Sequence, residues 1–259
     1  MSSNRFSAQE LIRYSRQMAL EEIGFSGQQK LKAARVLCAG LGGLGSPLSL
    51  YLAAAGVGTI GLVDGDRIEA GNLHRQILYR SSQVDESKAL SAQKQLLSLN
   101  PCITVNVYPE KLTADNAVDL IGQYDIIADG TDNFKTRYLI HDVCFQLEKP
   151  YVYASVSQFT GYCSIFSGGQ GPCLRCVFPQ PPQEQATMDC NSNGVLGMLP
   201  GMLGIIQATE IMKWLVQAGQ SLNNRLLKVD LLNMIFKDIR LARNPDCKLC
   251  ASTSSCSPP

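Results

Sequence analysis

Residues 40–45 have the composition of a phosphate-binding turn. They read Gly-Leu-Gly-Gly-Leu-Gly, and three glycines have the G-x-G-x-x-G spacing: Gly40, Gly42 and Gly45. Glycine permits the tight turn and lets backbone N–H groups approach a phosphate that a Cβ would exclude. A helix that begins after the turn would add oriented donors and partial positive charge. Alone, this spacing is also typical of an ordinary tight turn.

The flanking sequence favours nucleotide binding over an ordinary turn. Residues 36–39 are a short apolar run that predicts a buried strand, and residues 47–55 predict a helix of small side chains. A second predicted strand at residues 59–63 ends in Asp64 and Asp66. An acidic side chain about 20 residues beyond the turn can bind a ribose hydroxyl.

A third polar strand end follows the apolar residues 124–128, where residues 129–133 read Asp-Gly-Thr-Asp-Asn. Ligands of doubly wound sheets bind beyond the carboxyl ends of the strands, so we expect this segment to meet the other two. Asp132 is placed to hold Mg²⁺ beside a triphosphate, because Mg²⁺ commonly binds one or two carboxylates together with phosphates. The alternative is that Asp129 or Asp132 only caps a helix that begins near Phe134.

Several basic side chains could contact phosphates. Arg75 and Lys88 follow the second predicted strand, where Arg75 would bind as a fork and Lys88 as a point charge. Arg16 lies on a predicted amphipathic helix at residues 8–21, with Ser7 as its N-cap. Taken singly, each of these three cations could equally be a solvated surface charge.

The cysteines indicate a metal site. Cys173 and Cys176 form one C-x₂-C pair, and Cys247 and Cys250 form a second pair about 70 residues later. Four thiolates make a closed tetrahedral zinc site, which is structural because no coordination position stays open. Two redox pairs are the alternative. Cys190 stands apart from both pairs and is either a nucleophile in a polar loop or an inert surface thiol.

Composition sets limits on location and partners. A net charge of +1 gives no reason to expect nucleic-acid or membrane binding through bulk electrostatics. The N-terminus lacks an apolar signal-peptide core, and ten cysteines without such a signal disfavour disulfides. The apolar residues 195–206 are too short for a membrane span and fit a buried or subunit-interface helix. We therefore expect a cytoplasmic protein.

The predicted elements give an α/β fold. Beyond those above, we expect helices at 86–99 (capped by Asp85), 113–121, 134–147 and 195–217, and strands at 103–108, 151–156, 158–166, 225–230 and 234–240. Residues 167–193 lack periodicity and predict a long functional loop. This order indicates a doubly wound, Rossmann-like, mostly parallel sheet with antiparallel edge strands.

The combined motifs closely resemble the bacterial ThiF/MoeB/HesA adenylyltransferases, relatives of ubiquitin-activating enzymes. The matching segments occur in order: RYSRQ (13–17), GLGGLG (40–45), DGD (64–66), NLHRQ (72–76), Lys88, DGTDN (129–133), CLRC (173–176) and CKLC (247–250). The resemblance implies a single adenylation domain over 1–250, with a nucleotide-binding core at about 34–150 and a carrier-binding and zinc part at about 151–250. The Ser- and Pro-rich composition of residues 251–259 predicts a disordered tail.

The resemblance also implies a reaction. The C-terminal Gly-Gly carboxylate of a small ubiquitin-like sulfur carrier would attack the α-phosphorus of ATP, giving an acyl-adenylate and pyrophosphate. Positioning and charge neutralisation would carry the rate. By matching positions, Asp64 and Asp66 would serve the ribose side and Asp132 the Mg²⁺. The phosphates would be held by Gly43 with the other turn glycines and by Asn72, Arg75, Gln76 and Lys88.

Further partners follow from the same resemblance. Arg16 would reach the active site of the partner subunit in a homodimer, and Cys190 matches a crossover-loop cysteine that can link to the carrier as an acyl-persulfide. Sulfur would come from a separate donor such as a cysteine desulfurase. The thiamin branch is favoured over the molybdopterin branch, and His74 departs from the glutamine common in the family. An NAD-dependent oxidoreductase and a non-catalytic carrier-binding scaffold are the remaining alternatives.

Overall fold

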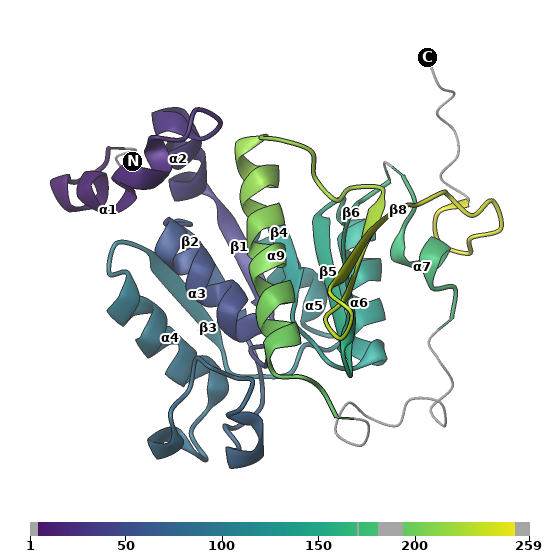
Figure 1. Cartoon of the computed structure of the whole chain (residues 1–259), viewed down its shortest axis with the longest axis horizontal. Helices are drawn as coiled ribbons and strands as arrows, with labels where there is room; N and C mark the ends of the chain where they lie inside the picture. The colour runs from purple at the N-terminus through teal and green to yellow at the C-terminus, as the bar shows by residue number, and fades with distance from the viewer. Residues whose placement is uncertain (1–4, 170, 181–193, 252–259) are drawn as a thin grey trace.

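The computed structural model describes residues 5–169, 171–180 and 194–251, and its described strands form one eight-stranded sheet (Figure 1). The strand order is β3-β2-β1-β4-β5-β6-β7-β8. The strands are β1 (Arg35–Ala39), β2 (Thr59–Val63), β3 (Thr104–Tyr108), β4 (Ile126–Asp129), β5 (Pro150–Ser157), β6 (Thr160–Ser167), β7 (Arg225–Asp230) and β8 (Ile235–Arg240).

The strand pairing changes from parallel to antiparallel halfway along the sheet. Strands β3, β2, β1, β4 and β5 pair in parallel, whereas β5–β6, β6–β7 and β7–β8 are antiparallel. The strand order reverses between β1 and β4, where Leu37 of β1 lies between Gly61 of β2 and Ile127 of β4. Ligands of open α/β sheets bind beside such a reversal, beyond the carboxyl strand ends. The predicted α/β class with antiparallel edge strands is confirmed.

Helices cover both faces of the sheet. They are α1 (Ala8–Met18), α2 (Gly24–Ala33), α3 (Gly45–Ala55), α4 (Lys88–Leu99), α5 (Ala117–Gly122), α6 (Phe134–Gln146), α7 (Leu174–Val177) and α9 (Met198–Val216), with short 3-10 turns at Ala70–Asn72 and Ser81–Gln83. Val36 and Cys38 of β1 face α3, α4 and α9 in one core, and the alternate residues Leu37 and Ala39 face α5 and α6 in another. Figure 1 shows these two layers on opposite sides of the sheet.

The N-terminal helices pack at the amino end of the parallel strands. Ser7 caps α1 as predicted, in a capping box with Glu10. Buried Tyr14 of α1 accepts a hydrogen bond from Asn100 at 2.7 Å and lies against Gly56. A Cβ on Gly56 would lie 2.5 Å from the Tyr14 ring, and its φ of 83° also favours glycine. Helix α2 was not predicted from the sequence, because Gly27 interrupts it and no side chain caps its start.

Several predicted boundaries are wrong by a few residues. The hydroxyl of Ser87, not the carboxylate of Asp85, caps α4, since Asp85 itself adopts a left-handed φ of 70°. Helix α5 begins at Ala117 rather than residue 113, and α9 begins at Met198 rather than 195. The long loop also contains the short helix α7. Among the described residues, no helix is long and apolar enough to cross a membrane.

Candidate nucleotide site and cysteine cluster

Glycines lock the turn after β1 against the loop after β4. A Cβ built on Gly45 would lie 2.0 Å from the carbonyl oxygen of Gly40, and one on Gly130 would lie 2.6 Å from the same oxygen. Gly40 itself has a φ of 84°. A Cβ on Gly42, by contrast, would meet only the amide nitrogen of Gln76, at 3.5 Å. Gly40, Gly45 and Gly130 are therefore required for packing, while Gly42 leaves space for a ligand.

Asp64 joins the end of β2 to the same turn. Its carboxylate accepts hydrogen bonds from the backbone N–H of Leu41 at 2.7 Å and of Asp66 at 2.8 Å. Tyr79 also bonds the turn, donating to the carbonyl of Leu41 at 2.9 Å. Burial raises the pKa of Asp64 despite the nearby charge of Lys88. This carboxylate fixes the turn and remains partly exposed at the edge of the sheet.

Basic and amide side chains gather after β2, and two of them, Arg75 and Gln76, lie beside the turn. The Nζ of buried Lys88, at the first residue of α4, lies 3.1 Å from the carboxylate of Asp66. Arg75 donates to the Oδ1 of Asn72 at 2.7 Å, and its Cδ would lie 3.5 Å from a Cβ on Gly43. Gln76 is buried, and its Oε1 has no partner among the described residues. A ligand phosphate at the turn would meet this cluster.

The loop after β4 presents one carboxylate to solvent. Asp132 is exposed, and no described residue bonds its carboxylate. The capping alternative for Asp129 and Asp132 is wrong, because Asn133 caps α6 by accepting from the N–H of Thr136 at 2.9 Å. Asp129 is instead fully buried and forms an ion pair with Arg137, at 3.2 Å. Mg²⁺ favours such a free carboxylate beside phosphates, so Asp132 fits the ion.

Arg137 is a residue that sequence reasoning missed. It lies eight residues beyond Asp129, on the second turn of α6, and is buried. Buried arginines are rarely unpaired, so an arginine in the helix that follows an acidic strand end was a usable signal. Burial lowers the pKa of Arg137, but Asp129 and the hydroxyls of Tyr153 and Tyr151 outweigh that effect and leave the pKa raised.

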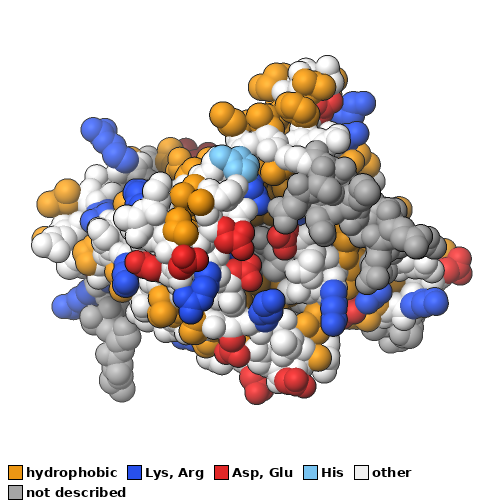
Figure 2. Space-filling model, turned by 90° about the horizontal axis from the view of Figure 1, so that it is seen from below, with side chains coloured by type: hydrophobic (Ala, Val, Ile, Leu, Met, Phe, Trp, Pro, Cys, Tyr) orange, Lys and Arg blue, Asp and Glu red, His pale blue; other side chains and the backbone are white. Residues whose placement is uncertain are grey.

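The predicted meeting of three strand ends is confirmed. Leu41 is bonded to Asp64, Gly40 lies against Gly130, and Gly43 lies beside Arg75. Helix α9 packs against these residues, because a Cβ built on Gly43 would lie 3.1 Å from the side chain of Pro200. Figure 2 views the molecule from this edge and shows acidic and basic side chains intermingled across it.

The structure keeps Arg16 away from this group within one chain. Arg16 is exposed on α1, and the neighbouring Gln17 bonds the carbonyl of Ala55, at the C-terminal end of α3. The glycine turn lies at the other end of the 11-residue helix α3. At 1.5 Å per residue, roughly 15 Å separates the two ends of that helix.

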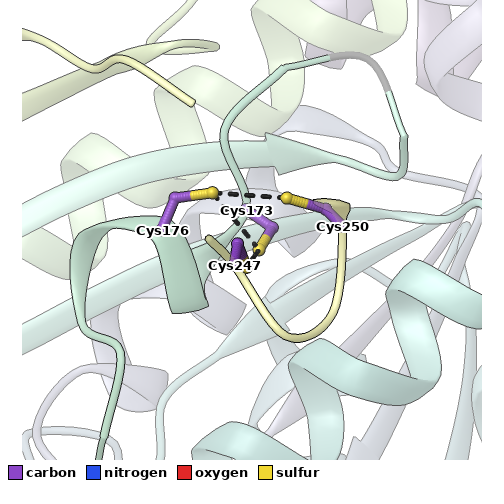
Figure 3. Close-up of side chains that lie close together, drawn as sticks. All are labelled: Cys173, Cys176, Cys247 and Cys250. Atoms are coloured by element: carbon purple, nitrogen blue, oxygen red, sulfur yellow. Dashed lines mark hydrogen bonds between the residues drawn. The ribbon is translucent and has the colours of Figure 1, made fainter. Parts of the chain in front are cut away.

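The two cysteine pairs come together beside α6. One atom from each of the four side chains lies within 4.8 Å of the others, and the closest sulfur pairs are Cys176–Cys250 at 3.3 Å and Cys173–Cys247 at 3.5 Å (Figure 3). Three of the four residues are buried. Burial raises the pKa of Cys173, whereas backbone N–H groups outweigh burial at Cys247 and lower its pKa to about 7. Four thiols in this arrangement fit a tetrahedral zinc ion.

Helix α6 anchors the first cysteine pair. The Nε2 of buried His141 accepts from the N–H of Leu174 at 3.0 Å. Asp142 binds Arg175 through two hydrogen bonds of 2.6 and 2.9 Å, and Tyr138 donates to the carbonyl of Phe178 at 2.6 Å. These contacts hold residues 174–178 independently of a metal. Cys190 lies outside the described residues.

A doubly wound sheet with a glycine turn, an acid after β2 and a free carboxylate after β4 defines a nucleotide-binding α/β protein. The ThiF family model matches residues 14–249. The chain belongs to the ThiF family.

Named relatives and solved structures agree with this family. The chain is 45% identical to the sulfur carrier protein adenylyltransferase of Thermus thermophilus over 95% of this chain and 93% of that protein. It is 47% identical to the adenylyltransferase and sulfurtransferase MOCS3 of Mus musculus, over 94% of this chain but 53% of the mouse protein. The chain thus spans about half the length of MOCS3.

Crystal structures of E. coli MccB share the fold. MccB with AMPCPP and MccA superposes with a TM-score of 0.79 at 25% identity, covering 92% of this chain and 74% of that one. Another MccB complex has a TM-score of 0.81 at 22% identity and covers 96% of this chain and 76% of that one. These likenesses extend over both the parallel and the antiparallel parts of the sheet.

Proposed function

We propose that this protein adenylylates the C-terminal carboxylate of a small ubiquitin-like sulfur carrier ending in Gly-Gly. The observation that carries the proposal is the meeting of the glycine turn, the Lys88–Asp66 pair and the free carboxylate of Asp132 at one edge of the sheet. The names of the Thermus and mouse relatives, both adenylyltransferases, support it.

The chemistry needs little covalent help from the protein. A carrier carboxylate oxygen attacks the α-phosphorus of ATP, the bond to the β-phosphate oxygen breaks, and pyrophosphate leaves. Lys88 and Arg75 would neutralise the developing charge, with Asn72 and Gln76 beside them and the turn glycines at the phosphates. Asp64 and Asp66 would serve the ribose side, and Asp132 would hold Mg²⁺, which adds charge neutralisation to the phosphates.

The part beyond β5 offers a surface for the carrier. All six residues of β8 are exposed, and Ile235 and Ile239, which share one face of the strand, are 44% and 41% exposed. Exposed apolar side chains on one face of an edge strand are typical of interaction surfaces. We therefore assign nucleotide binding to about residues 34–150, and carrier docking with the cysteine cluster to about 151–250, within one domain over 1–250.

Arg16 is proposed to act in the partner subunit of a homodimer. It lies at the opposite end of α3 from the glycine turn, so it could serve the site only from another chain. Exposed Tyr51 of α3 and Ile205 of α9 border a cavity of about 230 Å³ near α1. An apolar surface of this kind suits the interface that such a dimer needs.

The pathway and the sulfur donor are finer proposals. The thiamin branch is favoured, and activation of a molybdopterin synthase carrier is the alternative. Cys190 would act only in a later sulfur transfer, with sulfur supplied by a separate donor such as a cysteine desulfurase. On this assignment, Cys190→Ala leaves adenylation unchanged and impairs only thiocarboxylate formation, which mass spectrometry of the carrier measures.

Exchange of radioactive pyrophosphate into ATP tests the function. Purified protein should catalyse exchange only when a carrier ending in Gly-Gly is present, and thiamin-type and molybdopterin-type carriers can be compared directly. Asp132→Ala should abolish exchange while carrier binding, measured by calorimetry, survives. Binding of NAD without any exchange would favour an oxidoreductase, and exchange that persists in Asp132→Ala would remove Asp132 from the site.

A further inference from the structure

A buried polar cluster surrounds the stem of the loop that carries Asp132. The carboxylate of Asp129 accepts from the N–H of Thr131 at 2.8 Å, from its hydroxyl at 2.6 Å, from the Nε of Arg137 at 3.2 Å and from the hydroxyl of Tyr151. Asp129 is 0% exposed and Arg137 5%. Tyr151 is also 0% exposed, so Asp129, Arg137 and Tyr151 are shielded from any ligand at the sheet edge.

The same cluster also holds the loop backbone. Arg137 donates from its Nη2 to the carbonyl of Thr131 at 2.7 Å and to that of Ala154 at 3.1 Å. The buried amide of Gln207, on α9, donates to the carbonyl of Asp129 at 2.8 Å. The backbone is therefore held on both sides of Gly130, one and three residues before Asp132.

Asp132 is the exception in this loop. Asp129 and Thr131 before it and Asn133 after it are engaged, whereas the carboxylate of Asp132 has no bonding partner among the described residues. Three hydrogen-bonded residues thus surround one carboxylate that is available to a ligand. This arrangement is typical of metal sites, in which buried hydrogen-bonding partners orient the residues that bind the metal.

We propose that the Asp129–Arg137–Tyr151 cluster is the positioning device for the metal ligand Asp132. This inference rests on the proposed function and adds to it the groups that fix the ligand. Arg137 and Tyr151 are positioning residues, which act on the metal only through the loop. Loss of one of their hydrogen bonds should loosen Asp132 and weaken divalent-cation binding with nucleotide.

Tyr151→Phe is the most selective variant, because it removes only the hydroxyl that bonds Asp129. Tyr153→Phe is its matched control, since that hydroxyl bonds Ser155 at 2.7 Å and not Asp129. Thr131→Val removes a second hydrogen bond to Asp129 without touching Tyr151. Thermal melting establishes that each variant is folded.

Binding of Mn²⁺, measured by electron paramagnetic resonance with AMPCPP present, is the direct readout. Tyr151→Phe and Thr131→Val should weaken Mn²⁺ binding about tenfold, as loss of an outer-shell partner commonly does, and Tyr153→Phe should not. The Mg²⁺ needed for half-maximal pyrophosphate exchange should rise in parallel, with the carrier KM unchanged.

Two kinds of failure are distinguishable. Absence of exchange by the unmodified protein would overturn the proposed function. Exchange by the unmodified protein with the same Mn²⁺ affinity in Tyr151→Phe, Thr131→Val and Tyr153→Phe would overturn the positioning role alone. Equal weakening in Tyr151→Phe and Tyr153→Phe would also overturn it, because the effect would then belong to the aromatic cluster in general.

Discussion

The ammonium group of Lys88 lies 3.1 Å from the carboxylate of Asp66, although the lysine side chain is 7% exposed and the aspartate 57%. A buried cation such as Lys88 needs a partner of opposite charge. Here the partner, Asp66, is solvent-exposed and lies at the edge of the proposed phosphate site. On the proposed function, Asp66 holds Lys88 in place until a phosphate binds.

Lys88→Met should therefore lower pyrophosphate exchange strongly while leaving the fold intact. A donor aimed at developing charge contributes on the order of a hundredfold to the rate. Asp66→Asn should cost about 1 kcal/mol of stability without ATP, since Asp66 itself is largely exposed. Urea unfolding and exchange rates measure the two effects. A Lys88→Met enzyme with full exchange would contradict the role of Lys88.

Gly45 and Gly42 should respond differently to alanine. A Cβ on Gly45 collides with the backbone of Gly40, so Gly45→Ala should lose roughly 3 kcal/mol of unfolding free energy. Gly42→Ala meets only Gln76 at 3.5 Å and should keep its stability while losing nucleotide affinity. Denaturant unfolding and ATP titration separate these outcomes. Equal stability of the two variants would contradict the packing role of Gly45.

Subunit complementation tests Arg16. Arg16→Ala and Asp132→Ala should each be inactive alone, but mixed dimers would contain one site with both intact residues. After random exchange of subunits, a recovery of about a quarter of the wild-type exchange rate is expected. Mixing Asp132→Ala with Lys88→Met, two changes in the same site, is the control that should stay inactive. No recovery in the first mixture would place Arg16 outside the partner's site.

Metal removal should release one cysteine pair and not the other. His141 and Asp142 hold residues 174–178 on α6 without help from a metal, whereas residues 247–250 contact the first cysteine pair through their sulfurs. Chelation should therefore speed tryptic cleavage at Lys248, which is already exposed, and leave cleavage at Arg175 slow, as mass spectrometry of the fragments would show. Cys250→Ser should lose zinc in elemental analysis, and Cys102→Ser should retain it. Early cleavage at Arg175 would contradict the anchoring.

The sequence predicts most of the fold because each element carries its own local signal. The apolar runs of β1, β2 and β4, the Ser7 cap and the paired cysteines are all readable within a few residues. Helix α2 is different: it is stabilised by packing, with Gln28 bonding the carbonyl of Ala55, and its own sequence gives little indication. Tertiary contacts override weak helix propensity there.

The candidate functional site was also only partly predictable from the sequence. Glycine spacing and strand-end acids predict where a ligand lies, but they do not tell which acid is buried. Asp129 and Asp132 are three residues apart and chemically identical, and only the burial of Arg137 and Tyr151 beside Asp129 decides that Asp132 is the free one. Such long-range pairing is invisible to spacing rules.

One unbroken sheet runs from β3 beside the proposed nucleotide edge to β8 on the far side. A hinge motion between the parallel and antiparallel halves of the sheet would have to break backbone hydrogen bonds between neighbouring strands. The continuous sheet therefore disfavours rigid-body opening between these halves. On the proposed function, turnover therefore involves movement of the loops at the carboxyl edge of the sheet. The tail of the proposed carrier can then enter and leave while the sheet beneath it keeps its shape.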